Sequence, residues 1–168
     1  VSDSSFTSSI DSTYKLYIFK IVDVNPATDG EDFMFQANAT DSSSYNRTMT
    51  TTYWRGGHNE ADDSTFGGQS NGYLITADQG AGTDYQELAL NVGNGADESL
   101  SGELYLFHPS NTSYMKWFRS TMQYHEADNH TITSFCQGYL DDTTAIDDIQ
   151  FKMSSGNMDA TIKLWGVG

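Results

Sequence analysis

Short runs of β-forming residues, separated by clusters of Gly, Asn, Asp and Ser, recur along this chain and constrain its fold more than any other feature. No stretch has a convincing helical period. The sequence therefore predicts an all-β fold, an antiparallel, jelly-roll-like β-sandwich of about nine or ten strands. The expected strands are Tyr14–Val24, Asp32–Ala37, Asn46–Arg55, Gln86–Val92, Glu103–Phe107, Tyr114–Tyr124, Thr131–Tyr139, Ala145–Met153 and Thr161–Trp165.

Two of these strands, Tyr14–Val24 and Tyr114–Tyr124, are apolar on both faces. A two-layer sandwich normally leaves one face of each strand in water, so the second face needs a cover. The long irregular segment Gly56–Gly82 could supply it, and so could another subunit. We expect a homo-oligomer, most simply a trimer, because closed symmetry is the usual solution for repeated subunits.

The 168 residues suit one domain with a core of its own. The first twelve, VSDSSFTSSIDS, are polar and rich in serine. We therefore expect residues 1–12 to form a polar N-terminal arm or linker and residues 13–168 to form a single β-sandwich domain. Removal of residues 1–12 is expected to leave the sandwich folded.

Charge narrows the list of partners. The formal net charge is −15, from 23 acidic residues against 8 lysines and arginines. A surface this acidic repels the phosphates of nucleic acids and the headgroups of anionic membranes, so neither is an expected partner. Salt screens the repulsion between the acidic groups, which suits a saline setting.

No motif for catalysis or metal binding stands out. The single cysteine, Cys136, is interpreted as a small buried hydrophobe. His125 and His130 are five residues apart, whereas the zinc-protease helix needs its histidines four apart. The acidic clusters at 58–63 and 141–148 lack the regular spacing of a helix-loop-helix calcium site. We expect no cofactor, no metal and no catalytic residues. An enzyme such as a polysaccharide depolymerase is the third hypothesis.

Exposed aromatic rings would indicate sugar binding, because rings stack on the C–H faces of sugars. Trp54 lies on the threonine-rich face of its strand, and Trp117 shares a face with Met115, where a core position is expected. The candidate contacts to a glycan or a partner are Trp54, Arg55 and His58, which border the Gly56–Gly82 segment. A carbohydrate-binding module that recognises a host surface glycan is thus the second hypothesis.

Several strings of the sequence carry a resemblance to a known family. IDSTYKLYIFKIVDVNPATDGEDFMFQ, HNEADD, VGNGADESLSGELYLFHPS and AIDDIQFKMSSGNMDATIKLWGVG together resemble a domain of virion structural proteins from marine tailed bacteriophages. The resemblance runs from about Ser9 to the C-terminus, and it assigns no catalytic or binding residues.

The resemblance implies a non-enzymatic structural protein on the surface of a phage virion, as a capsid decoration or as a tail-fibre or appendage module. Its expected partners are then other virion proteins of the capsid or tail. This is the leading functional hypothesis from the sequence. A stiff, acidic, disulfide-free sandwich suits such a place, because it presents variable loops at its ends.

Overall fold

The structure, a computed structural model, describes residues 1–61 and 71–168. They are all-β and form twelve strands: β1 (Asp3–Phe6), β2 (Leu16–Pro26), β3 (Glu31–Ala39), β4 (Met49–Asn59), β5 (Gly72–Tyr73), β6 (Gly80–Gly82), β7 (Gln86–Val92), β8 (Leu100–Phe107), β9 (Lys116–Glu126), β10 (His130–Leu140), β11 (Ile146–Met153) and β12 (Met158–Val167). Each of the nine expected strands is present, and the predicted all-β antiparallel sandwich is confirmed, with twelve strands in these residues where nine or ten were expected. These residues include no helix that is long and apolar enough to span a bilayer.

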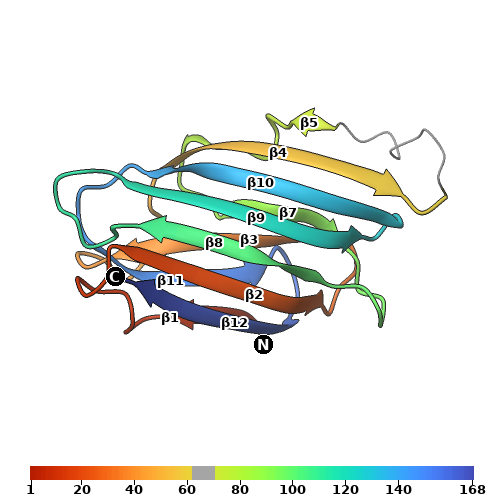
Figure 1. The fold of residues 1–168 in the computed structure, drawn as a ribbon, viewed down its shortest axis with the longest axis horizontal. Helices are drawn as coiled ribbons and strands as arrows, with labels where there is room; N and C mark the ends of the chain where they lie inside the picture. Colours follow the sequence, from red (N-terminus) through yellow and green to blue (C-terminus); the bar gives the residue numbers. More distant parts are fainter. Residues whose placement is uncertain (62–70) are drawn as a thin grey trace.

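The strands form two layers (Figure 1). The large sheet has the order β12-β2-β8-β9-β10-β4, with the short strands β5 and β6 on the free edge of β4. The small sheet has the order β1-β11-β3-β7 and lies behind it. All pairs are antiparallel, and the layers are joined where Val92 of β7 pairs with Glu126 of β9.

The core lies between the layers and follows from strand alternation. In β9, Phe118, Ser120, Met122 and Tyr124 point inward and are buried, so the residues that alternate with them point outward. From the small sheet, Phe35 packs edge-on against Phe118, with ring centroids 4.8 Å apart. Each outward position of the large sheet is thus fixed by buried neighbours.

One irregularity changes the alternation in β2. Asp23 has a positive φ of 51°, and the pairing of β2 with β8 shifts register between Ile21 and Val24. An extra residue in a strand produces such a bulge, which turns the residues on its two sides relative to each other. Val22 is consequently exposed, although Val24 is buried.

Residues 1–12 differ from the arm or linker expected from their polarity. Residues 3–6 form strand β1, which pairs with β11, and the ring of Phe6 packs edge-on against Phe19 and Phe151 at 5.2 and 6.3 Å. Ile10 is buried as well. Two apolar side chains and four residues of backbone pairing therefore place this segment within the sandwich.

The Gly56–Gly82 segment was expected to be irregular throughout. Its first residues continue β4 to Asn59, and its last part contributes β5 and β6, which pair with the edge of β4. These described parts extend the large sheet sideways and do not cover its outward side. Residues 62–70, which include part of the 58–63 acidic cluster, lie outside the described residues.

Candidate functional site on the outer face of the large sheet

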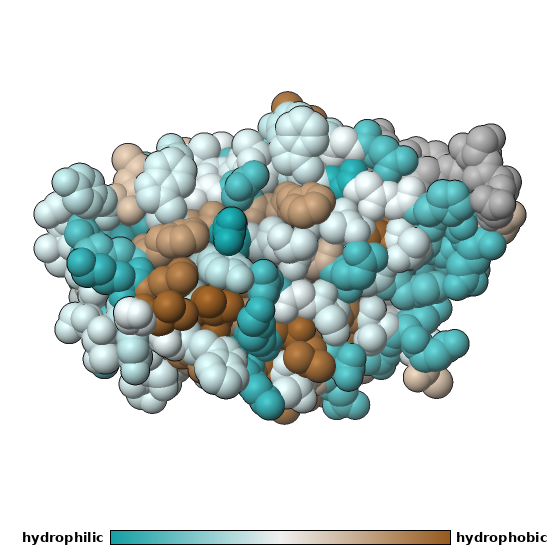
Figure 2. Space-filling model, in the orientation of Figure 1, coloured by the Kyte–Doolittle hydropathy of each residue, from teal (hydrophilic) through white to brown (hydrophobic). Residues whose placement is uncertain are grey.

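The outward-pointing residues of β12, β2, β8, β9, β10 and β4 form one continuous surface, here called the outer face (Figure 2). In Figure 2, apolar side chains gather over its middle and are interleaved with hydrophilic ones. Six strands at about 4.8 Å spacing make this surface about 24 Å wide. It is therefore large enough for an extended ligand.

Aromatic rings are the main feature of the outer face. Trp117 is 56% exposed, Trp54 47% and Phe135 46%, although these are side chains that proteins usually bury. Their exposure on a folded chain indicates a contact surface. The rings of the outer face belong to Trp54, Tyr105, Phe107, Trp117, Phe135, Tyr139 and Trp165.

The strand register holds these rings in cross-strand groups. Trp117 on β9 lies opposite Tyr139 on β10, with ring centroids 5.2 Å apart in an edge-on contact. Phe135 on β10 lies opposite Trp54 on β4, and Trp54 packs against Tyr73 of β5 at 5.4 Å. Cross-strand pairs of this kind keep rings in fixed positions, because each ring limits the rotamers of the next.

Three adjoining hollows lie among the rings. The first, of about 420 Å³, is lined by Phe107, Trp117 and Tyr139. The second, of about 300 Å³, is lined by Tyr105, and the third, of about 560 Å³, by Trp54. Gln137 lines all three, Arg119 lines the first two, and Phe135 lines the last two. The hollows therefore form one band across the outer face, each within the size range of small-ligand sites.

Charged side chains lie in this band and beside it. Arg119 places its guanidinium carbon 4.6 Å from the ring centre of Tyr105. Lys20 on β2 donates a hydrogen bond to Glu103 on β8, directly across the strand pair. This hydrogen bond is the main reason that the pKa of Glu103 is lowered and the pKa of Lys20 is raised. Glu103 is thus an ionised carboxylate with a cationic partner.

The structure separates the three residues predicted to contact a ligand. Trp54 and His58 occupy outward positions of β4, as alternation requires. Arg55 points the other way and is buried, with its Nη1 atom 3.3 Å from Oε1 of the fully buried Glu126. The expectation for Arg55 as a surface contact is therefore wrong, because the residue between two outward residues of a strand must point inward.

The expectation that Trp117 is a core residue is also wrong. Its neighbours Lys116 and Phe118 are both buried, so Trp117 must point outward. Arg119 and Gln137, at the centre of the band, were not predicted as site residues. The signal that could have identified them is the alternation of β9 and β10 once Phe118 and Cys136 are assigned to the core.

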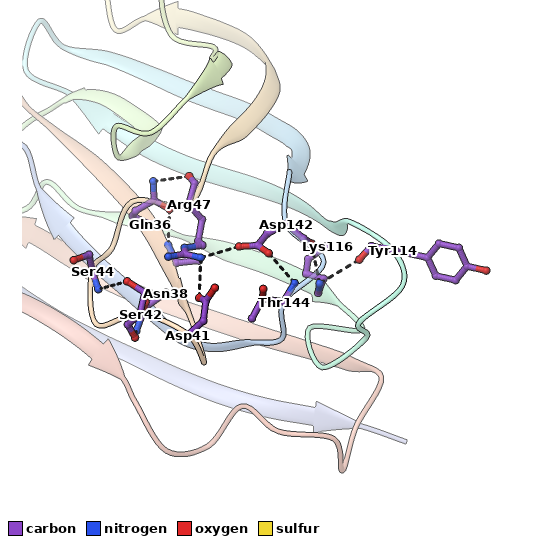
Figure 3. Close-up of polar contacts among 11 residues, drawn as sticks. Gln36, Asn38, Asp41, Ser42, Ser44, Arg47, Tyr114, Lys116, Asp142 and Thr144 are labelled. Carbon is purple, nitrogen blue, oxygen red and sulfur yellow. Dashed lines mark hydrogen bonds and ion pairs between the residues drawn. The ribbon is translucent and has the colours of Figure 1, made fainter.

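A polar network at one end of the sandwich fixes the start of β9 (Figure 3). Lys116 is fully buried, and its Nζ donates to the backbone oxygens of Tyr114 at 3.2 Å and Asp142 at 2.9 Å. Desolvation lowers the pKa of this lysine, and the nearby carboxylate of Asp142 partly offsets the effect. Arg47 pairs with the same Asp142 at 2.8 Å. The inward anchor at Lys116 holds the next residue, Trp117, on the outer face.

A scan of protein-family models, a search of curated proteins and a search of solved structures found no match to this chain. Within residues 1–61 and 71–168, no group of three or more His, Cys, Asp or Glu side chains is placed to hold a metal ion. The outer face itself offers aromatic rings, hydrogen-bonding side chains and a few charges.

Proposed function

We propose that this chain is a non-enzymatic carbohydrate-binding module whose site is the outer face of the large sheet. The observation that carries the proposal is the band of three hollows, in which exposed rings alternate with hydrogen-bonding side chains. Sugars have the matching character, because their C–H faces stack on rings while their hydroxyl edges need hydrogen-bond partners.

Different residues of the band supply the stacking and the hydrogen bonds. Trp54, Phe135 and Trp117 offer ring faces and edges for stacking. Gln137 and Thr52, which are paired neighbours on β10 and β4, offer donors and acceptors to sugar hydroxyls. All five side chains stand on strands, so the site is largely formed before the ligand arrives and little order has to be created on binding.

A glycan array with the purified chain tests this proposal. We expect binding to a restricted set of glycans and at least a tenfold loss of affinity in Phe135→Ala, because that ring lines two of the three hollows. Tyr114→Ala is the matched control, since Tyr114 is 72% exposed but lines none of them. Absence of binding, or equal binding by wild type and Phe135→Ala, would refute the proposal.

The setting of the module on a tailed-phage particle stays a prediction that rests on the sequence resemblance. The two ideas are compatible, because a particle surface is where a host glycan would be met. Antibody labelling of purified virions in the electron microscope tests the setting, with labelled particles expected. Detection of the chain only in the cytosol of infected cells would contradict it.

A further inference from the structure

The cations of this chain are unevenly distributed over its surface. Arg55 and Lys116 are buried, and Arg47 is mostly buried and paired with two aspartates. Of the five other cationic side chains, three point outward from the large sheet, on β2, β9 and β12. These three are Lys20, Arg119 and Lys163.

Acidic side chains are sparse in the same place. Glu103 is the one carboxylate at a paired outward position in the middle of the six strands of the described structure, and Asp23, in the bulge of β2, adds a second beside Ser101 of β8. Three cations against these two carboxylates leave about one net positive charge at the middle of the outer face, although the whole chain carries −15. The Debye length at physiological salt is about 8 Å, so a ligand on this face is largely screened from acids elsewhere.

Arg119 is the cation placed to meet a ligand. It is exposed, lines two of the three hollows and holds its guanidinium group over the ring of Tyr105. Lys20, by contrast, is engaged with Glu103. A stacked guanidinium keeps its N–H edges available, and those edges match the paired oxygens of a carboxylate or a sulfate.

We infer that the glycan recognised by the outer face is acidic, and that Arg119 binds its carboxylate or sulfate group while the neighbouring rings hold the sugar. This inference rests on the proposed carbohydrate-binding function and specifies the ligand class of the same site.

The small number of cations on the outer face favours an acidic glycan over two other occupants, single-stranded nucleic acid and a second copy of the chain. Single-stranded nucleic acid also stacks on rings, but it needs a groove of cations that follows a phosphate at every residue. A second copy of the chain, docked by the same face, would bring Arg119 and its neighbouring lysines close to those of its partner. A polymer with spaced acidic groups needs the arrangement observed here, a few cations among rings.

The test compares acidic and neutral glycans on the same array and then titrates matched polymers. A polygalacturonate methyl ester freed of its methyl groups at spaced residues is compared with the fully esterified polymer, and lightly sulfated dextran is compared with dextran. We expect the acidic glycans to bind at least tenfold tighter than their neutral counterparts, and added salt to weaken their binding. Arg119→Gln should abolish this preference. Lys152→Gln, the matched control on the small sheet, should preserve it.

The outcomes separate the two proposals. Binding to neutral glycans that depends on Phe135 but not on charge or Arg119 overturns the acidic ligand and leaves the carbohydrate-binding function standing. No binding to any glycan refutes both. Tighter binding to oligo(dT) than to any glycan, or an oligomer that Phe135→Ala dissociates, assigns the face to another occupant and also overturns the inference. Equal thermal unfolding of the variants confirms that they are folded.

Discussion

At the scale of single residues, the strongest constraint is the charge cluster on the inner side of the large sheet. Arg55, Glu126 and His130 come from β4, β9 and β10, and Nδ1 of His130 lies 3.0 Å from Oε2 of Glu126. Glu126 is wholly buried, so it depends on these neighbours to compensate its charge. The cluster therefore holds the side chain of Arg55 on the inner side of the sheet, where it cannot contact a ligand on the outer face.

Arg55→Met is expected to lower the free energy of unfolding by about 3 kcal/mol, because it leaves a buried carboxylate without its guanidinium partner. Lys20→Met, which removes an exposed partner of Glu103, is the control and should cost less than about 1 kcal/mol. Urea denaturation of both variants measures the difference. Similar losses in the two variants would mean that the buried pair contributes little.

Glu87 on β7 is expected to give the stability a distinct pH dependence. Burial, helped by the nearby charge of Asp32, raises the pKa of Glu87 from 4.5 to about 6. The folded chain then holds this proton more tightly than the unfolded chain, so stability falls as pH rises from about 4.5 to 6. The loss in the free energy of unfolding is about 1 kcal/mol, which is less than the full pKa shift implies because Glu87 is only partly buried.

Glu87→Gln should remove this fall and raise the free energy of unfolding at pH 7 by about 1 kcal/mol. Unfolding measured between pH 4 and 8 tests it, with the exposed Asp97→Asn as control. An unchanged pH profile in Glu87→Gln would show that its carboxyl group is well hydrated.

At the scale of elements, β1 ties the N-terminal segment to the small sheet. Phe6→Ala should lower the free energy of unfolding by about 2 kcal/mol, because its half-buried ring packs on Phe19 and Phe151. Ser2→Ala, at an exposed site, should change little. Urea denaturation measures this difference. Unchanged stability in Phe6→Ala would favour the expectation from composition that residues 1–12 form an arm or linker.

The elements that sequence reasoning found and missed differ in a physical way. Nine long strands were predicted, because each carries its own alternation or β-rich composition. β1, β5 and β6 are two to four residues long, and only pairing with distant partners makes them strands. The bulge at Asp23 likewise depends on its pairing with β8.

The candidate site was also predictable only in part, because alternation within a strand can be read from the sequence but pairing between distant strands cannot. Alternation within β4 places Trp54 and His58 outward, and the same alternation applied to β9 would have placed Trp117 there. Which strands become neighbours is decided by long-range packing. The sequence alone therefore could not bring Arg119 and Gln137 into one band with Phe135.

At the scale of the whole molecule, net charge limits how copies of the chain associate. The predicted homo-oligomer needs an apolar contact that tightens with salt, because each copy carries a charge of −15. Sedimentation velocity over a range of salt concentrations measures this, with a trimer as the expected species. A monomer at every salt and at high protein concentration would contradict the predicted oligomer.

Cys136 gives the molecule a kinetic reporter. It is the single cysteine of the chain, it is fully buried on β10, and burial raises the pKa of its thiol. A thiol reagent can therefore reach it only when the strands around it separate, and the labelling rate follows those rare openings. A ligand that binds only the closed form slows labelling in proportion to its occupancy. Reaction of one buried sulfur thus detects ligands on the opposite side of the sheet.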